Sequence, residues 1–264
     1  MSNQTIMRIC LSLILVLFSF LAHAQYDSVI IKNYTIISDK SPNFNASLDS
    51  ASGFCRVAVI GDIDKNGVKD LVVGAYYQNK MKGAIYRVLL NEDFTVKSAA
   101  EIVNTELTDE LKDEDRFGAS VISVGDIDGD GNIDIVCGAP QDDDKMGSDS
   151  TINSGALYVL FLDENAKIKK FTKISVYYGG LTGLVSHSFM GVGAGLKPLG
   201  DIDGDGICDI IVSAPSSNGT SIIYNYKGYL MVLCLNTDGT VKKQIDIKDA
   251  ELGFEVVTKE EFGS

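Results

Sequence analysis

Aspartates recur at one fixed spacing in three short stretches of the chain. The stretches read GDIDKNGVKD from Gly61, GDIDGDGNID from Gly125 and GDIDGDGICD from Gly200, and an apolar segment follows each of them directly. All three fit the pattern D-x-D-x-[DN]-G-x-x-D. A carboxylate cluster beside a segment that is to be buried is costly unless a cation compensates its charge. The spacing therefore predicts three cation sites.

Calcium is the cation that this pattern favours. Side-chain oxygens at positions 1, 3, 5 and 9 of a tight glycine-containing loop can converge on one point, and the backbone carbonyl at position 7 can join them. Ca²⁺ accepts six to eight oxygens at roughly 2.3–2.6 Å and tolerates irregular geometry, whereas Mg²⁺ requires an octahedron. Position 12 is Val73, Cys137 or Val212, so the bidentate glutamate of an EF-hand is absent.

A simpler interpretation is that Asp-Gly turns merely join strands. One loop alone leaves both interpretations open, but three loops at the same place in three repeats favour calcium. The first loop has Asn66 at position 5, with Lys65 and Lys69 close by. Its ligand set carries three carboxylates where the others carry four, so it is expected to bind calcium most weakly.

The loops belong to longer repeats. Each loop follows a glycine- and phenylalanine-bearing segment, GFCRVAV from Gly53, RFGASVI from Arg116 and FMGVGAG from Phe189, and a second shared block follows from Lys82, Ser154 and Lys227. Runs of β-branched and aromatic residues bounded by Gly, Asp and Asn favour four antiparallel strands per repeat. The fold class predicted is all-β, with β-propeller-type repeats in about three to four blades and an incomplete or open propeller.

Two segments are expected to depart from a plain succession of repeats. The only candidate helix lies around TELTDELKDED from Thr105, where a polar loop is equally consistent. The stretch from Asp27 to Ile37 resembles the fourth-strand region, so the chain is expected to start partway through a repeat. An acidic segment from Gln141, QDDDKMGSD, is predicted to be a solvated loop, with bridging through calcium as the alternative.

At these points the chain resembles the FG-GAP repeat family, which includes the seven-bladed propeller of integrin α subunits. Phe117-Gly118, the aspartate loop and Gly138-Ala139-Pro140 occur in order, and the likeness covers nearly all of residues 28–264. Gly53-Phe54-Cys55, Gly74-Ala75-Tyr76 and Ser213-Ala214-Pro215 depart from the two signatures. The calcium ligands that the resemblance implies are Asp62, Asp64, Asn66, the carbonyl of Val68 and Asp70; Asp126, Asp128, Asp130, the carbonyl of Asn132 and Asp134; and Asp201, Asp203, Asp205, the carbonyl of Ile207 and Asp209.

The first residues have the three parts of a secretory signal peptide. Arg8 precedes the apolar run from Ile9 to Leu21, and Ala22-His23-Ala24 is a small-x-small cleavage site. The apolar run is shorter than the ~20 residues that span a bilayer. Residues 1–24 are therefore predicted to be the signal peptide and residues 25–264 the FG-GAP repeats, in a secreted, extracellular or cell-surface protein without membrane insertion after cleavage.

Net charge limits the kinds of partner that are expected, and the cysteines limit the disulfides. A formal net charge of −13 argues against nucleic acid and anionic membranes and suits a cation binder. Buried free thiols are the expectation for the cysteines after the signal peptide; a Cys208–Cys234 disulfide is the alternative if residue 214 lies opposite residue 228. Glycosylation sequons begin at Asn33, Asn45 and Asn218.

The function expected is adhesion or ligand recognition, with an extracellular protein or glycan as partner and Ca²⁺ at three sites. The alternatives are a non-catalytic accessory propeller of a secreted hydrolase or lyase, and a purely structural scaffold. His187 is the only histidine beyond the signal peptide and no nucleophile elbow occurs, so the chain is not expected to be an enzyme.

Overall fold

The computed structural model describes residues 34–146, 149–182, 190–215 and 229–247. The chain divides into two units, Met1–Ile36 and Ile37–Ser264, and every described helix and strand lies in the second. The predicted signal peptide and most of the segment from Asp27 to Ile37 fall outside the described residues, and residues 34–37 form no strand.

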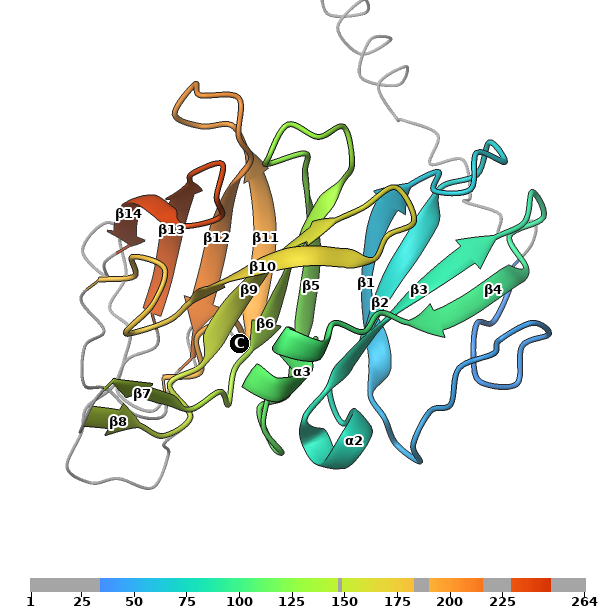
Figure 1. The fold of residues 1–264 in the computed structure, drawn as a ribbon, viewed down its shortest axis with the longest axis horizontal. Coiled ribbons are helices and arrows are strands. Elements are labelled where there is room, and N and C mark those ends of the chain that lie inside the picture. The colour runs from blue at the N-terminus through green and yellow to red at the C-terminus, as the bar shows by residue number, and fades with distance from the viewer. Residues whose placement is uncertain (1–33, 147–148, 183–189, 216–228, 248–264) are drawn as a thin grey trace, which may run out of the picture. The chain divides into compact units, whose positions relative to one another are not determined.

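Three four-stranded antiparallel sheets make up the described fold, and we call them the first, second and third blades (Figure 1). The first blade has the order β1 (Phe54–Gly61), β2 (Asp70–Ala75), β3 (Ala84–Leu90), β4 (Val96–Glu101). The second has β5 (Ser120–Gly125), β6 (Asp134–Ala139), β9 (Ala156–Leu162), β10 (Ile168–Ile174). The third has β11 (Gly195–Gly200), β12 (Asp209–Ala214), β13 (Tyr229–Leu235), β14 (Val241–Ile247). The predicted all-β fold of four-stranded blades is confirmed, in the form of an open arrangement.

Short elements connect the strands. The hairpin of β7 (Asp144–Met146) and β8 (Asp149–Thr151) lies between β6 and β9, and α2 (Gln78–Met81) lies between β2 and β3. The segment that could be helix or loop contains α3 (Thr105–Glu110), whose N-terminus is capped by Asn104 Oδ1 accepting from the Leu107 amide. Neither α2 nor α3, the helices of the described residues, has the length and apolarity to cross a bilayer.

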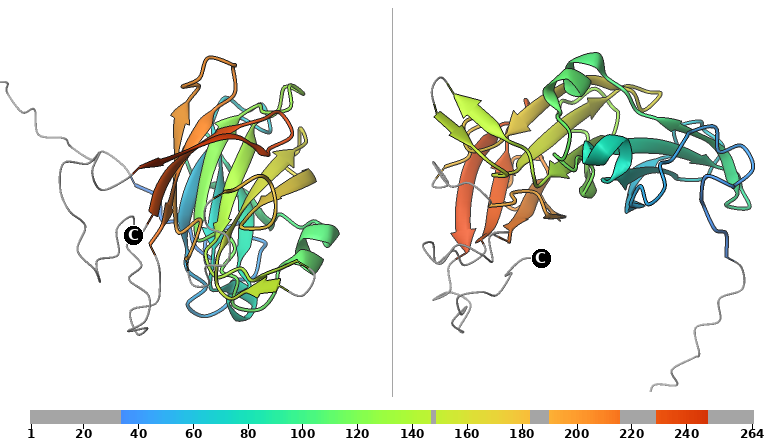
Figure 2. Two further views of the ribbon diagram at one scale, coloured as in Figure 1. Left: turned by 90° about the vertical axis from the view of Figure 1, so that its left-hand side faces the viewer. Right: turned by 90° about the horizontal axis from the view of Figure 1, so that it is seen from below.

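The blades lie side by side, and two shared cores hold them together (Figure 2). Ile60 and Ile85 of the first blade belong to the same apolar cluster as Tyr158 of the second. Leu157 of the second blade shares another cluster with Leu233 of the third. All seven residues of β9 are buried, because its successive side chains point alternately into the two cores.

Glycines at the two signatures let neighbouring blades approach closely. A Cβ on Gly74 would lie 2.1 Å from the carbonyl oxygen of Gly118, and a Cβ on Gly138 would lie 2.0 Å from that of Gly193. Gly193 therefore occupies in the third repeat the place that Gly118 has in the second. The structural counterpart of Phe117-Gly118 is Val192-Gly193, whereas Phe189 lies outside the described residues.

The strand register determines whether Cys208 and Cys234 lie opposite each other and could form a disulfide. Ala214 pairs with Tyr229 and Ile210 with Leu233, so the third blade is shifted by one residue from the register that would place Cys208 opposite Cys234. The alternative of a Cys208–Cys234 disulfide is therefore wrong, because the four described cysteines are free. Cys137 and Cys234 are buried as expected, whereas Cys55 is exposed and Cys208 is only partly buried. Of the sequons, Asn45 is exposed, and Asn33 and Asn218 lie outside the described residues.

Candidate metal centres

The three aspartate loops occupy one end of the blades. Each joins the inner strand of its blade to the second strand, β1 to β2, β5 to β6 and β11 to β12. Because β5 lies beside both β1 and β11, the loops follow one another along the same end (Figure 1). The fold thus repeats one candidate site three times.

The aspartate at position 9 is a buried anchor. Asp134 is fully buried; its Oδ2 accepts from the Ile127 amide and its Oδ1 from the Leu162 amide, both at 2.9 Å. Asp70 makes the equivalent bonds to Ile63 and Leu90. Burial raises the pKa of both carboxyls, and these hydrogen bonds only partly oppose the rise. A cation beside them would favour the charged form.

The third loop leaves one anchor oxygen unsatisfied. Asp209 is fully buried and its Oδ2 accepts from the Ile202 amide at 3.0 Å, but its Oδ1 has no hydrogen-bond partner. Its carboxylate lies within 4.8 Å of ligand atoms of Asp203 and Cys234. A buried, unpaired carboxylate oxygen is costly without a compensating group.

The aspartate at position 1 organises its loop through the backbone. Asp126 accepts from the amides of Gly129, Asp130 and Gly131 at 2.7–3.0 Å. Asp201 accepts from the equivalent amides of the third loop, and Asp62 from those of Asn66 and Gly67. The tight turn favours glycine, because Gly129 and Gly131 have φ values of 78° and 90°, although Lys65 adopts a φ of 59° at the place of Gly129 in the first loop.

The aspartate at position 3 has its oxygens free of the backbone. The Oδ1 of Asp64 and the Oδ1 of Asp128 are buried without a hydrogen-bond partner. Carboxylate oxygens converge within 4.8 Å of one another in all three loops. The sets are Asp62, Asp64 and Asp70; Asp126, Asp128 and Asp134; and Asp201, Asp203 and Asp205.

The three loops differ in whether the side chain at position 5 joins the cluster of carboxylates. Asp205 joins the set of the third loop, whereas Asp130 is outside that of the second. Asn66 donates to the Leu90 carbonyl at 2.6 Å and accepts from the Val68 amide at 2.8 Å, so its side chain is already engaged. Ligation by Asn66, and by the carbonyls of Val68, Asn132 and Ile207, remains a prediction.

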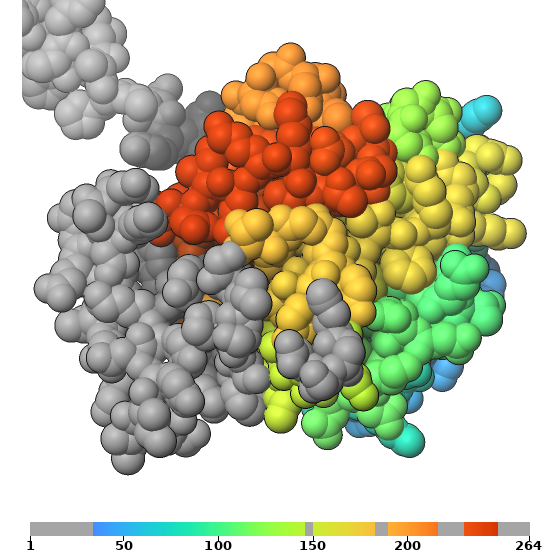
Figure 3. Space-filling model, turned by 60° about the vertical axis from the view of Figure 1, so that its left-hand side comes forward, coloured from blue at the N-terminus to red at the C-terminus, as the bar shows by residue number. Residues whose placement is uncertain are grey.

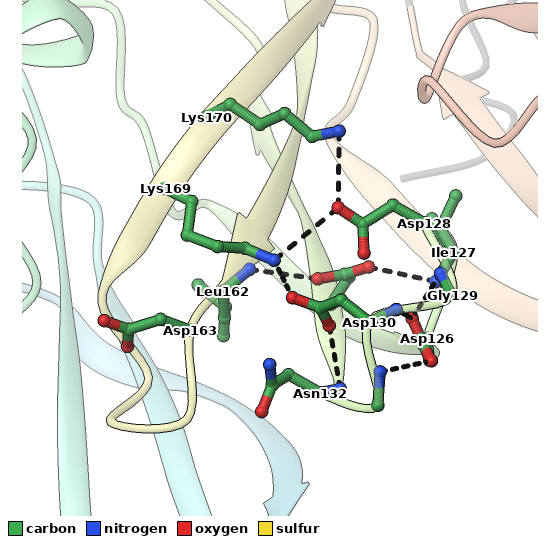
Figure 4. A network of polar contacts seen from close by, with 12 residues as sticks. Asp126, Ile127, Asp128, Gly129, Asp130, Asn132, Leu162, Asp163, Lys169 and Lys170 are labelled. Carbon is green, nitrogen blue, oxygen red and sulfur yellow. Dashed lines mark hydrogen bonds and ion pairs between the residues drawn. The ribbon is translucent and has the colours of Figure 1, made fainter.

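Lysines from the outer strands reach into these carboxylates, and sequence reasoning did not single them out. Lys97 Nζ lies 2.8 Å from Asp64 Oδ2, and Lys242 Nζ lies 2.9 Å from Asp203 Oδ2 and 2.6 Å from Asp205 Oδ2. In the second loop Lys169 contacts Asp128 and Asp130 (Figure 4). The ion pair with Lys169 lowers the pKa of Asp130 to about 2.

A visible signal could have identified these lysines. They share one place in the repeated block, within FTVK, AKIK and GTVK. The block by itself indicates only strand and turn, because the contact between its lysine and the loop depends on how the outer strand lies across the blade.

The acidic segment from Gln141 is not simply a solvated loop. Asp142 and Asp144 are buried, and Lys173 Nζ lies 2.7 Å and 3.0 Å from their Oδ1 atoms. The Tyr158 hydroxyl donates to Asp142 Oδ2 at 2.6 Å. The segment therefore docks on the outer strand of the second blade through buried ion pairs.

The comparisons with known proteins agree with the loop and signature positions. The model of the FG-GAP repeat matches residues 117–160, which run from Phe117 through the second loop into β9. Residues 117–160, which include β5, the second loop and β6, are therefore similar to the FG-GAP repeat. The resemblance predicted from the signatures is confirmed.

Integrin α subunits are among the similar curated proteins. The chain is 26% identical to Drosophila melanogaster integrin alpha-PS2 over 190 residues, which cover 71% of this chain and 12% of that protein. It is 27% identical to Gallus gallus integrin alpha-8 over 195 residues, 71% of this chain and 16% of the relative. Mus musculus integrin alpha-2 is 30% identical over 173 residues, with 62% and 13% covered.

The matched region is a small part of these three relatives, since it spans only 12–16% of their length. What is shared is an integrin α-like module of FG-GAP-type blades.

Proposed function

We propose that the chain is a calcium-binding recognition module of the cell surface or the extracellular space. The observation that carries the calcium assignment is that one carboxylate oxygen in each of the three equivalent loops, the Oδ1 of Asp64, Asp128 and Asp209, is buried without a hydrogen-bond partner. Oxygen donors of this kind suit Ca²⁺, which accepts many oxygens in flexible geometry. The donor sets of the first two loops contain oxygen alone.

The proposed ligands are the carboxylates of each loop with the position-7 carbonyl. In the second loop these are Asp126, Asp128, Asp130, the carbonyl of Asn132 and Asp134. A bound calcium ion supplies positive charge that ties the loop to the buried position-9 anchor. We expect the first loop to be the weakest site, because Asn66 replaces a carboxylate and donates to Leu90.

Adhesion or ligand recognition is the finer part of the proposal. Similarity to integrin α subunits supports a module that binds an extracellular protein or glycan, and the end of the blades that carries the three loops offers a surface for it. We further propose residues 1–24 as a signal peptide and residues 25–264 as the repeat region. A calcium-stabilised scaffold, or a non-catalytic accessory to a secreted hydrolase or lyase, is the alternative.

The calcium assignment is tested by thermal unfolding with calcium and with chelator. At calcium about 100-fold above a dissociation constant, each filled site adds roughly 2.7 kcal/mol to stability. We expect calcium to raise the melting temperature of the wild type by at least about 5 °C. The triple variant Asp64→Asn, Asp128→Asn, Asp203→Asn should lose most of that rise, because it removes the position-3 carboxylates and keeps the backbone anchors.

Glu164→Gln is the matched control, since Glu164 is an exposed acid in the turn between β9 and β10. It should show the full calcium-induced rise. An equal rise in the triple variant would mean that calcium acts elsewhere, and no rise in the wild type would end the calcium assignment.

A further inference from the structure

We propose that Lys97, Lys169 and Lys242 are built-in competitors for the three cation sites. In the metal-free protein each ammonium group compensates the loop carboxylates, and it must leave before a divalent cation can bind. The inference rests on the proposed calcium sites and adds a device that sets their affinity.

The three lysines are structurally equivalent. Each is the second residue of the outer strand of its blade, after Val96 in β4, Ile168 in β10 and Val241 in β14. Each contacts the loop of its own blade and of no other described blade. Three independent blades thus place a cationic side chain at the same point, which a chance surface ion pair does not explain.

The lysines contact carboxylate oxygens that accept no described backbone hydrogen bond. Asp64 accepts no described backbone hydrogen bond, and its Oδ2 is the atom that Lys97 contacts. In the third loop Lys242 contacts Oδ2 of Asp205, whereas the Oδ1 accepts from the Ile207 amide. The position-1 and position-9 carboxylates, which backbone amides hold, form no described ion pair with these lysines. Lysine and metal would therefore compete for the same carboxylates.

Joint occupancy is excluded by distance and charge. A calcium ion lies roughly 2.3–2.6 Å from its oxygen ligands, and Lys242 Nζ lies 2.6 Å from Asp205 Oδ2. Two cations bound to one oxygen at these distances would lie within about 5 Å of each other, where their repulsion is strong. Binding of the metal must displace the ammonium group.

Displacement needs no change in the fold. The side chains of Lys97, Lys169 and Lys242 are 45%, 32% and 39% exposed, and their strands are the outer strands of the blades. Figure 3 shows β14 and β10 at the surface on one side of the molecule. A flexible lysine stem can swing its ammonium group into water from such a position.

The second loop should be the most strongly regulated. Lys170 Nζ lies 3.3 Å from the same Asp128 oxygen that Lys169 contacts, and it also lies over the Phe161 ring. Two ammonium groups therefore hold one loop. The first loop has the mildest competitor, because Lys97 contacts only Asp64 in the described structure.

The test is calcium titration by calorimetry of the full chain and of the variants Lys169→Met and Lys242→Met. Methionine keeps an unbranched side chain and removes the charge. We expect each variant to bind calcium about three- to tenfold more tightly at its own loop, in line with the loss of one or two partly exposed ion pairs. The metal-free variants should melt at a lower temperature than the metal-free wild type, because their carboxylates lose the compensating charge.

Lys243→Met and Lys167→Met are the matched controls. Lys243 follows Lys242 in β14, and Lys167 lies two residues before Lys169; in the described structure neither forms an ion pair with a loop. Each control lowers the local positive charge equally, so it measures the general electrostatic effect. We expect a change below about twofold for each.

The outcomes separate the two proposals. A wild type that binds calcium, with Lys242→Met and Lys169→Met no tighter than their controls, overturns the lysine inference and leaves the calcium sites standing. A wild type and lysine variants that all fail to bind overturn the calcium sites themselves. Should a methionine variant fold poorly, Lys242→Gln provides the same comparison.

Discussion

Asp115 is a buried carboxyl outside the three loops, and its environment has a consequence for pH dependence. It is 3% exposed and accepts from the Lys112 amide at 2.7 Å. Burial raises its pKa to about 7, with repulsion from Asp142 opposed by attraction to Lys173. Because this pKa lies above the unfolded value of 3.8, the folded state binds the proton more tightly. Its ionisation therefore lowers the stability of the fold as pH rises from about 4 to about 7.

Asp115→Asn should stabilise the protein at pH 8 and not at pH 4. Asparagine keeps an acceptor for the Lys112 amide and carries no charge, so it avoids the cost of a buried carboxylate. We expect a gain of at least about 1 kcal/mol in the free energy of unfolding at pH 8, measured by urea unfolding in chelator. Asp113→Asn, at an exposed neighbour, should show no such trend. A gain that is the same at pH 4 and pH 8 would contradict the role of ionisation.

The spacing of residues predicted the candidate loops well and their surroundings poorly. D-x-D-x-[DN]-G-x-x-D fixes which side chains converge, because a tight loop determines its own geometry. It does not show that Lys97, Lys169 and Lys242 enter the loops, nor that Asn66 turns toward Leu90. Those contacts arise between strands, where the partners are far apart in the sequence.

Within a blade, repetition made the strands predictable, but the register and the blade contacts came only with the structure. Runs of β-branched and aromatic residues bounded by Gly, Asp and Asn identify the strands of each repeat. They do not fix the pairing of Ala214 with Tyr229, and a shift of one residue was enough to separate Cys208 from Cys234. The signature glycines were predicted as positions; their role in the approach of neighbouring blades depends on tertiary packing.

Gly138→Ala should disrupt the contact between the second and third blades. The added Cβ would lie 2.0 Å from the Gly193 carbonyl oxygen and 2.4 Å from Ser120 Oγ, within a buried strand. Backbone atoms cannot yield easily, so we expect a loss of at least about 2 kcal/mol in the free energy of unfolding by chemical denaturation. Gly129→Ala is the comparison: nothing lies within 4 Å of its Cβ position, and its positive φ should cost only about 1 kcal/mol. Equal losses would argue against a steric blade contact.

Across the whole described fold, the second blade joins the other two. Its strands contribute to both shared cores, with Tyr158 and Leu160 in one and Leu157 and Phe161 in the other. The second blade therefore has no apolar core of its own, whereas the first blade also has a separate cluster that contains Val88 and Leu90. The number of strands in a repeat was predictable from the sequence, whereas this sharing of apolar side chains was not.

The described blades should consequently unfold together. We expect one calorimetric transition in chelator, with the calorimetric and van't Hoff enthalpies equal. Leu157→Ala, in the core between the second and third blades, should lower the melting temperature of the entire transition and cost about 2–4 kcal/mol. The exposed substitution Val103→Ala serves as the control and should change little. A separate early transition in the Leu157→Ala variant would show that the third blade unfolds alone.

Because the three loops lie at the same end of the blades, bound calcium would give the protein an asymmetric charge distribution. With every loop filled, six positive charges would be added at a single end, against a formal net charge of −13 for the chain. The migration of the protein in a native gel and its retention on an anion exchanger would both register that gain. The same end would turn from a surface that repels anionic partners into one that can accept a carboxylate or a sulfated sugar.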